Sequence, residues 1–320
     1  MAGDEWDKDV VFYQIWPRSF ADGNGDGIGD LYGVYEKLNY VKSLGVGGIW
    51  FSPLYVSPNA DFGYDIADYR RISPDYGDEK IFRRVLDRAH ELGLKVIMDL
   101  VINHTSIEHE WFRKGIDPAS PYHDYYIWRD PAPDGGVSNN WQSMFGGPAW
   151  TYNEENGQYY LHLFSAGQPD LNMDNPRVRD EVKDVMRYWL DMGVDGFRED
   201  VITLISKAEG LPNDRGPLSL PKGRQYYDCG PHLADYLGEF RHDVLAQHDC
   251  FVVGEAPFVD VEKARMLTQG PRESRLLDMV FSFEHMEADC LFTEYIPLPF
   301  SPRRLMRALS RWQDGLHGVG

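Results

Sequence analysis

Short apolar runs recur along the chain, and each is bounded by turn-type or charged residues. They cover residues 10–16, 48–51, 95–101, 193–202, 250–255 and 277–281. The run at 95–101 is apolar on both faces, which is typical of strands in parallel sheets. Between the runs, helical spacing of apolar positions predicts helices at 31–44, 78–92, 176–192, 233–247 and 301–316. The alternation of strand and helix predicts parallel β/α units.

Loops that swell after individual strands favour a (β/α)8 barrel over a doubly wound sheet. No GxGxxG motif follows the first run, which disfavours dinucleotide binding. We therefore expect an α/β fold: an incomplete (β/α)8 TIM-type barrel of about six units. A closed barrel has eight strands, so either the last two are missing from this sequence or the count of six is wrong.

Residues 105–175 interrupt the alternation. This stretch is rich in Pro, Gly, Asn, Asp, Trp and Tyr and has no long periodic element. It is too long for a simple loop, so it predicts an inserted irregular subdomain after the third strand. The expected organisation is a first barrel part at 1–104, the inserted subdomain B at 105–175 and a continuation of the barrel at 176–320.

Composition restricts the class of partner. The 320 residues are 42% hydrophobic and 26% charged, an ordinary globular mixture. The net charge of −19 disfavours binding to nucleic acid or to an anionic membrane, because both would repel the chain. A small neutral molecule such as a sugar is compatible with this charge.

Three cysteines, Cys229, Cys250 and Cys290, form no CxxC pair and indicate reduced thiols. The first seven residues carry neither a basic segment nor an apolar one, so we expect no signal peptide. No apolar run is long enough to cross a bilayer. Together these features favour a cytoplasmic protein.

Three carboxylates lie at the ends of successive strands: Asp99, Asp200 and Glu255. In a barrel such positions meet at one mouth, where catalytic residues lie. Arg198 shares a strand face with Asp200, and a structural Arg–Asp pair is the alternative explanation for these two residues. Glycoside cleavage requires two carboxylates of opposite protonation. We expect Arg198 to lower the pKa of Asp200, and burial with the neighbouring negative charge to raise that of Glu255.

An acidic loop at 22–30, DGNGDGIGD, places oxygen ligands at alternating positions. Hard cations prefer this donor pattern, and it resembles an EF-hand loop that has Gly33 where the bidentate Glu should be. The alternative is a solvated Asp/Gly turn. We expect a structural Ca²⁺ (or Mg²⁺) and no organic cofactor. The expected metal ligands are Asp22, Asn24, Asp26, the carbonyl of Ile28, and Asp30.

Several motifs carry a resemblance to a known family. DLVINH at 99–104, GFREDV at 196–201 and VGE at 253–255 resemble three signature regions of the α-amylase superfamily, in order and at strand ends. QPDLN at 168–172 resembles a marker of the oligo-1,6-glucosidase subfamily, and GYDI at 63–66 resembles its pocket for the terminal sugar. The similarity runs from about residue 9 to the C-terminus.

The resemblance implies a retaining, exo-acting α-glucosidase with Asp200 as nucleophile and Glu255 as general acid/base. It implies that Tyr64 stacks beneath the terminal glucose, and that Val201 marks a preference for α-1,6 over α-1,4 bonds. The metal loop also matches the family. The implied substrate-binding residues are Tyr64, Asp65, Asp99, His104, Phe164, Gln168, Arg198 and Val201.

The sequence departs from the family in two places. Glu199 stands where an apolar residue is more frequent, and by alternation it should face away from Asp200. The fourth signature, an Asn-His-Asp on the seventh strand, is absent, so we expect a truncated chain with little turnover. Two alternatives stay open: a sucrose or trehalose isomerase or transglucosidase of the same family, and a non-catalytic relative that acts as a binding module. The oligomeric state is left open.

Overall fold

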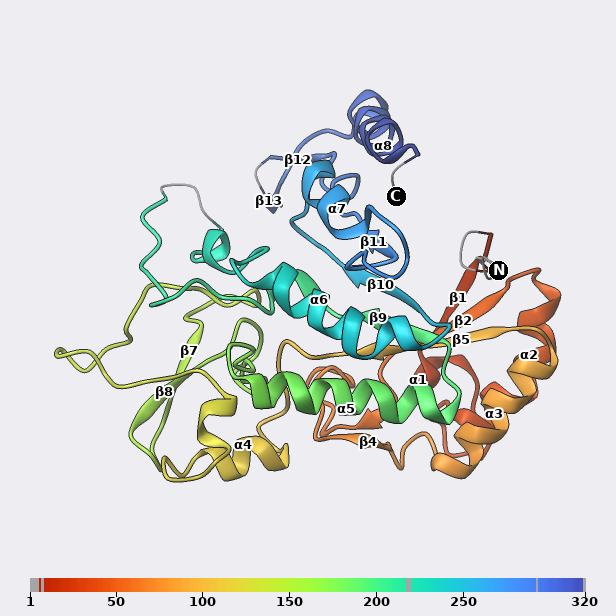
Figure 1. Ribbon diagram of the computed structural model, residues 1–320, viewed down its shortest axis with the longest axis horizontal. Helices are drawn as coiled ribbons and strands as arrows, with labels where there is room; N and C mark the ends of the chain where they lie inside the picture. The colour runs from red at the N-terminus through yellow and green to blue at the C-terminus, as the bar shows by residue number, and fades with distance from the viewer. Residues whose placement is uncertain (1–5, 7–8, 217–219, 292, 319–320) are drawn as a thin grey trace.

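A parallel sheet of six strands forms the centre of the protein (Figure 1), in the order β1-β2-β5-β9-β10-β11. The computed structural model describes residues 6, 9–216, 220–291 and 293–318. Each strand lies within a predicted apolar run, and the sheet curls as part of a barrel does, which confirms the expected fold. The strands are β1 (Phe12–Ile15), β2 (Gly48–Phe51), β5 (Lys95–Leu100), β9 (Gly196–Glu199), β10 (Phe251–Glu255) and β11 (Met279–Phe281).

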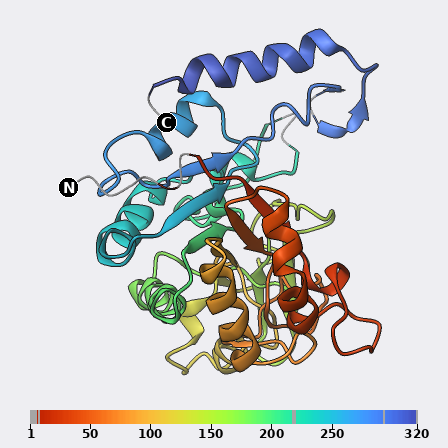
Figure 2. The ribbon, with the colours of Figure 1, turned by 90° about the vertical axis from the view of Figure 1, so that its right-hand side faces the viewer.

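Helices between the strands follow the predicted order (Figures 1 and 2). Asp78 caps α3 as expected, since its Oδ1 accepts a hydrogen bond from the N–H of Ile81 at 2.9 Å. The predicted helices are α2 (Leu31–Ser43), α3 (Glu79–Glu91), α5 (Pro176–Met192), α6 (Leu233–Asp243) and α8 (Pro302–Leu316). Three were not predicted, because each is too short for a periodic pattern: α1 (Pro17–Phe20), α4 (Glu110–Gly115) and α7 (Val261–Thr268).

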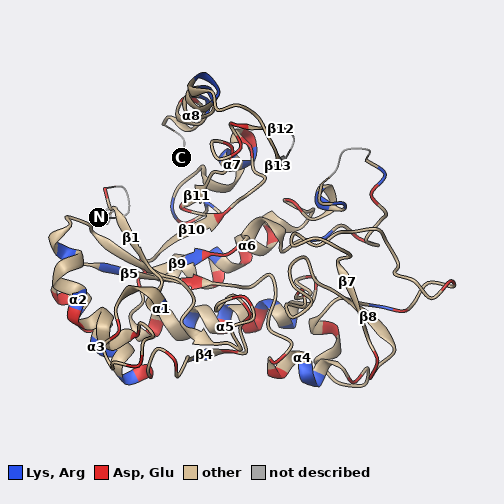
Figure 3. Ribbon diagram, turned by 180° about the vertical axis from the view of Figure 1, so that it is seen from behind, with Lys and Arg blue, Asp and Glu red and all other residues tan. Residues whose placement is uncertain are grey.

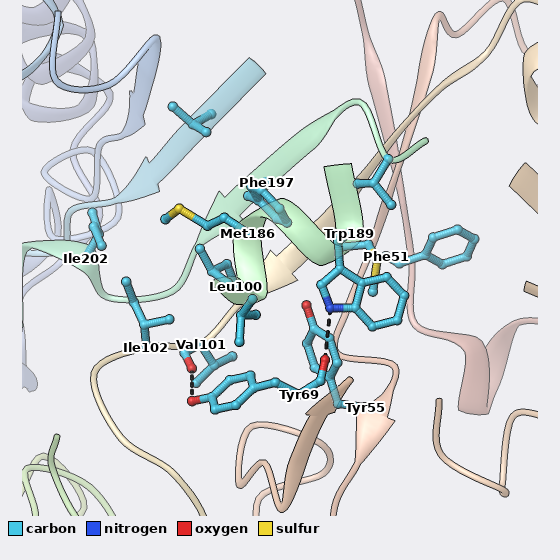
Figure 4. Close-up of a cluster of buried hydrophobic side chains, with 14 of the residues drawn as sticks. Phe51, Tyr55, Tyr69, Leu100, Val101, Ile102, Met186, Trp189, Phe197 and Ile202 are labelled. Atoms are coloured by element: carbon cyan, nitrogen blue, oxygen red, sulfur yellow. Dashed lines mark hydrogen bonds between the residues drawn. The ribbon is translucent and has the colours of Figure 1, made fainter. Parts of the chain in front are cut away.

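The core between helices and sheet is closed by a chain of hydrogen-bonded aromatic residues (Figure 4). Trp189 of α5 is completely buried, and its Nε1 donates to the carbonyl of Tyr69 at 2.9 Å. The Tyr69 hydroxyl in turn donates to the carbonyl of Val101 at 2.6 Å. These hydrogen bonds connect helix α5 to the segment that directly follows β5, the strand that carries Asp99.

The region at 105–175 contains more regular structure than expected. Besides α4 and the 3-10 turn η1 (His123–Tyr125), it holds an antiparallel sheet of three short strands in the order β6-β8-β7. Two further antiparallel pairs were not predicted. These elements are β6 (Trp128–Arg129), β7 (Trp150–Asn153), β8 (Gln158–Leu161), β3 (Tyr55–Val56), β4 (Asp68–Ile72), β12 (Cys290–Leu291) and β13 (Thr293–Pro297). Of these strands, β3, β6 and β12 have two residues each and are too short to give an alternating pattern in the sequence.

Asp and Glu residues are spread over many helices and loops of the chain (Figure 3), in keeping with the net charge of −19. Within the described part of the chain, none of the helices has the length and apolar character needed to span a membrane. The absence of a signal peptide was predicted from residues 1–7, and of these only Trp6 is among the described residues. Residues 319–320, at the end of the predicted barrel part, also lie outside the described residues.

Candidate active site

The three strand-end acids meet at one edge of the sheet. Asp99 lies in β5, Asp200 directly follows β9, and Glu255 ends β10. These three strands are neighbours, because β9 pairs in parallel with β5 on one side and with β10 on the other. Arg198 belongs to the middle strand, and its register partners are Asp99 on β5 and Val253 on β10. The topology therefore brings one guanidinium within reach of all three carboxyl groups.

Arg198 binds the three acids at once. Its Nη1 donates to Asp99 Oδ1 at 2.6 Å and to Asp200 Oδ1 at 2.7 Å, and its Nη2 donates to Glu255 Oε2 at 2.6 Å. The predicted common face of Arg198 and Asp200 is thereby confirmed. The arginine is only 6% exposed, so these charge-assisted bonds lie largely away from water and are strong.

Burial sets the protonation of this cluster. It raises the pKa of Glu255 to about 7, with the Asp200 charge adding to the effect, and it raises the pKa of Asp99 to about 6. For Arg198, burial opposes the charged form, but the three carboxylates outweigh it and raise the pKa. One cation among three acids leaves a negative excess, so the cluster holds a proton most readily on Glu255.

The expected effect of Arg198 on Asp200 is confirmed, because the guanidinium lowers the pKa of that carboxyl, but it does not decide the net shift. Burial outweighs it and raises the pKa of Asp200 to about 6. The sequence did not show that Asp99 lies beside Asp200, where its charge adds to the rise. The expected rise for Glu255 is confirmed.

Val201 fixes the backbone between the two acids. Its N–H donates to Glu255 Oε2 at 3.1 Å, and its φ of 38° lies in the left-handed region. A β-branched residue rarely adopts this conformation, which stores strain and recurs at functional sites. The turn after β9 thus aims a backbone donor at Glu255.

Two aromatic residues complete the wall around Arg198. The Tyr64 hydroxyl and Trp50 Nε1 each donate to Asp99 Oδ2 at 3.1 Å. The guanidinium lies 5.2 Å from the centre of the Trp50 ring and 5.7 Å from that of Tyr64, within the range of cation–π contact. Tyr64 was predicted and Trp50 was missed. The position of Trp50 inside β2, the strand next to β5, was the only signal available for it.

A second group of predicted residues lies beside Tyr64. The His104 ring centre is 5.1 Å from that of Phe164, and His104 Nε2 lies 3.0 Å from the carbonyl of Tyr64. Gln168 Nε2 donates to Asp61 Oδ2 at 2.8 Å and to the Tyr64 carbonyl at 3.4 Å. The structure thus brings His104, Phe164 and Gln168 together with Tyr64.

The acid of this group is Asp61, which the sequence did not single out. Its pKa is raised by burial, against the hydrogen bond from Gln168 and the charge of His104. The predicted Asp65 is fully buried, and its described contacts are with its own loop: it accepts from Ser57 Oγ at 2.9 Å and from the N–H groups of Ala60 and Asp61 at 3.0 Å. Asp65 therefore shapes the loop that carries Asp61.

The predicted metal loop is folded around its own acids. The N–H groups of Gly27 and Gly25 donate to the Asp22 carboxylate and lower its pKa, at 2.8 and 2.6 Å. Asn24 and Asp26 each accept a hydrogen bond from the N–H two residues ahead, at 2.8 Å. Asp30 caps α2 through the N–H of Gly33 at 2.7 Å.

The ligand atoms of this loop suit a hard cation, because all are oxygen atoms and they alternate along the sequence as in loops that bind such ions. Over the described residues, however, no group of three or more His, Cys, Asp and Glu side chains is gathered in a way that could hold a metal ion. The loop therefore supplies the correct atom types, while its carboxylates are turned toward backbone N–H groups.

An incomplete barrel with acids at its strand ends defines an α/β-barrel protein with a candidate active site at the carboxyl ends of its strands, and comparison with known families agrees with this fold. The family model for the alpha amylase catalytic domain matches residues 14–320, so the chain belongs to this family.

Its relatives include the oligo-1,6-glucosidase of Heyndrickxia coagulans, which is 49% identical over 99% of this chain and 58% of its own length. Similar solved structures include the trehalose-6-phosphate hydrolase of Bacillus licheniformis, with a TM-score of 0.91, 42% identity and coverage of 98% of this chain and 55% of that one. The trehalulose synthase of Pseudomonas mesoacidophila has a TM-score of 0.92 at 38% identity, over 99% of this chain and 57% of its own. The chain spans about half the length of the curated relatives that it matches.

Proposed function

We propose that the protein is a retaining, exo-acting α-glucosidase that releases glucose from the non-reducing end of short α-1,6-linked oligosaccharides. The observation that carries this proposal is the placement of Asp200 and Glu255 on adjacent strands, where both bind the guanidinium of Arg198. Retaining enzymes hold their two carboxyl groups roughly 5 Å apart, and two acids bound to one guanidinium are close enough to work on one bond. The identity of 49% to an oligo-1,6-glucosidase supports the substrate class.

In the proposed mechanism Asp200 attacks the anomeric carbon while Glu255 gives its proton to the leaving oxygen. Its pKa of about 7 suits Glu255 to carry that proton near neutral pH, whereas Asp200, at about 6, is more readily ionised. Water then attacks the glucosyl–Asp200 ester, and Glu255 accepts the proton from that water. Arg198 holds both carboxyl groups in register through these steps.

Substrate binding is assigned to the residues around Tyr64. Its ring would stack beneath the terminal glucose, and His104, Gln168, Phe164 and Asp99 would surround the sugar. We add Asp61 to this set because its carboxylate, and not that of Asp65, lies beside Gln168. Val201 borders the side on which the leaving group departs, since its N–H binds Glu255.

Trapping with a fluorinated glucoside tests the assignment. A 2-deoxy-2-fluoro glucoside with a good leaving group accumulates the covalent intermediate, and peptide mass spectrometry locates the ester. We expect the label on Asp200 and none on the Asp200→Asn variant. Asp278 is also buried, but its carboxylate binds Arg241 of α6 and the N–H of Val252, so Asp278→Asn is the matched control and should retain the label. A label on any other residue rejects Asp200 as the nucleophile.

A second candidate function is isomerisation of sucrose or trehalose, favoured by the likeness to a trehalulose synthase at 38% identity. The same two acids would form the glucosyl intermediate, which the released sugar and not water would then attack. Product analysis separates the two functions: glucose release from isomaltose supports hydrolysis, and a rearranged disaccharide from sucrose supports isomerisation.

We further propose that the loop at 22–30 binds a structural Ca²⁺ through Asp22, Asn24, Asp26, Asp30 and the carbonyl of Ile28. The alternating oxygen donors support this. Residues 105–175 are proposed to be an inserted subdomain, and the reduced cysteines support a location in the cytoplasm.

A further inference from the structure

Lys207 is a buried cation behind the proposed sugar pocket, and no step of the mechanism uses it. It is 5% exposed, and its Nζ lies 2.8 Å from Asp170 Oδ2 and 2.9 Å from Asn103 Oδ1. A lysine ammonium has donors and no acceptor. The atom of Asn103 that faces Lys207 must therefore be the amide oxygen, and this contact fixes the orientation of the whole amide group.

The orientation of Asn103 determines where His104 carries its proton. The amide nitrogen of Asn103 lies 3.3 Å from His104 Nδ1. An amide nitrogen only donates, so Nδ1 must offer its lone pair and the proton must reside on Nε2. The opposite side of the ring agrees, because Nε2 lies 3.0 Å from the Tyr64 carbonyl, which only accepts. Burial lowers the pKa of His104, so the ring carries a single proton.

A competing contact favours the opposite tautomer. Gln168 Nε2 lies 3.1 Å from His104 Nε2. The orientation of this amide is also fixed, because Gln168 Oε1 accepts from the N–H of Ser165 at 3.1 Å. Gln168 would therefore stabilise an unprotonated Nε2. Two amide donors oppose each other across one imidazole. The two hydrogens of Gln168 Nε2 already have acceptors in Asp61 Oδ2 and the Tyr64 carbonyl, so Asn103 decides between the tautomers.

We propose that Lys207 is a positioning residue that holds His104 in the Nε2–H tautomer by anchoring Asn103. The consequence for binding rests on the proposed function. In this tautomer the Nε2–H group donates to the Tyr64 carbonyl and so fixes the residue whose ring would stack beneath the terminal glucose.

The tautomer can be measured without any turnover. In the protein labelled with ¹⁵N-histidine, long-range ¹H–¹⁵N spectra distinguish a protonated from an unprotonated ring nitrogen, and His104→Gln assigns the signals. We expect wild-type His104 at pH 7 to show a protonated Nε2 and an unprotonated Nδ1. In Lys207→Met the Asn103 amide is free to turn, and we expect the population to move toward Nδ1–H. Lys183 is the matched control: it is also buried and ion-paired, but with Glu239 on α6, so Lys183→Met should leave His104 unchanged.

Two further variants guard against misfolding. Lys207→Met leaves Asp170 as an unpaired buried charge, so Lys207→Met/Asp170→Asn removes both charges and should give the same tautomer shift. Asn103→Asp places a carboxylate beside Nδ1 and should bring a proton to that atom. An Nδ1–H tautomer in the wild type, or an unchanged tautomer in the folded Lys207 variants, overturns the proposal; if those variants do not fold, the wild-type spectrum decides it.

A separate titration with glucose keeps the two proposals apart. Shifts of the His104 signals on addition of glucose support the sugar pocket. If the signals do not shift, the result counts against the proposed function. The tautomer assignment is unaffected, because it depends only on the spectrum without glucose.

Discussion

Glu199 allows a quantitative test of how burial controls charge in this protein. It follows Arg198 in β9 and faces away from the candidate site, as alternation predicted, toward Arg241 and Asp278. It is 1% exposed, and within the described residues neither carboxyl oxygen has a hydrogen-bond partner. Burial raises the pKa of Glu199 from 4.5 to about 8; Arg241 acts against this rise and Asp278 adds to it. The side chain is therefore a neutral acid in the folded protein at pH 7.

The direction of the effect on stability follows from linkage. The unfolded chain loses the Glu199 proton near pH 4.5, whereas the folded protein keeps it until about pH 8. The stability contribution is thus complete below pH 4.5 and is lost as the pH rises to about 8. Each pH unit in this window is equivalent to about 1.4 kcal/mol, so the loss reaches roughly 5 kcal/mol. At about 2 °C for each kcal/mol, the melting temperature should fall by roughly 10 °C.

Glu199→Gln removes this dependence, because an amide has the shape of the protonated acid and does not titrate. Melting temperatures at pH 5, 6, 7, 8 and 9 should diverge, with the variant increasingly more stable than the wild type up to about pH 8. Glu154 is exposed and serves as the control, since Glu154→Gln should follow the wild-type curve at every pH. Parallel curves for wild type and Glu199→Gln would refute the view that Glu199 is buried as a neutral acid.

Three other predictions follow from the structure. Removal of Ca²⁺ by a chelator should lower the free energy of unfolding by about 3 kcal/mol if the ion was present at a hundredfold excess over its Kd. In Asp26→Ala the chelator should leave thermal unfolding unchanged, and an equal loss of stability in that variant rejects the site. In Gly196→Ala the added carbon would lie 1.8 Å from the carbonyl of Phe251 at φ of 145°, so we expect a loss of about 3 kcal/mol or more in urea unfolding. Gly135→Ala meets nothing within 4 Å and should lose about 1 kcal/mol; equal losses would contradict this. Hydrolysis of isomaltose by the 320-residue chain should be at least about 10²-fold slower than by the Heyndrickxia coagulans enzyme, because the sequence has no Asn-His-Asp motif to stabilise the transition state; comparable rates would refute this.

Strand order and strand ends could be predicted from the sequence because burial on both faces imposes continuous apolar runs. The meeting of Asp99, Asp200 and Glu255 followed from the same rule, since parallel strands end at one edge of the sheet. The short elements could not be predicted. Strands of two residues, such as β3 and β6, leave no periodic trace, and their pairing depends on contacts far away in the sequence.

The acid beside Gln168 shows where the sequence fell short. Asp61 and Asp65 lie in the same loop, and neither occupies a strand position that would indicate a direction. Which of them reaches the pocket depends on the turn that Asp65 organises by accepting the N–H groups of Ala60 and Asp61. The choice between two nearby carboxylates is therefore made by backbone hydrogen bonds that no spacing rule reveals.

The net pKa shift of Asp200 could not be predicted for a related reason. A pair of residues on one strand face suggests one cation serving one acid, and such a pair lowers the pKa of the acid. In the folded protein the same guanidinium contacts acids from three strands, and each carboxyl is buried and faces the charge of another acid. Burial and these neighbouring charges outweigh Arg198, so the pKa values of Asp99, Asp200 and Glu255 all lie above the ordinary range. The protonation of the cluster thus depends on the acids that three adjacent strands bring together, a property of the sheet rather than of any one motif.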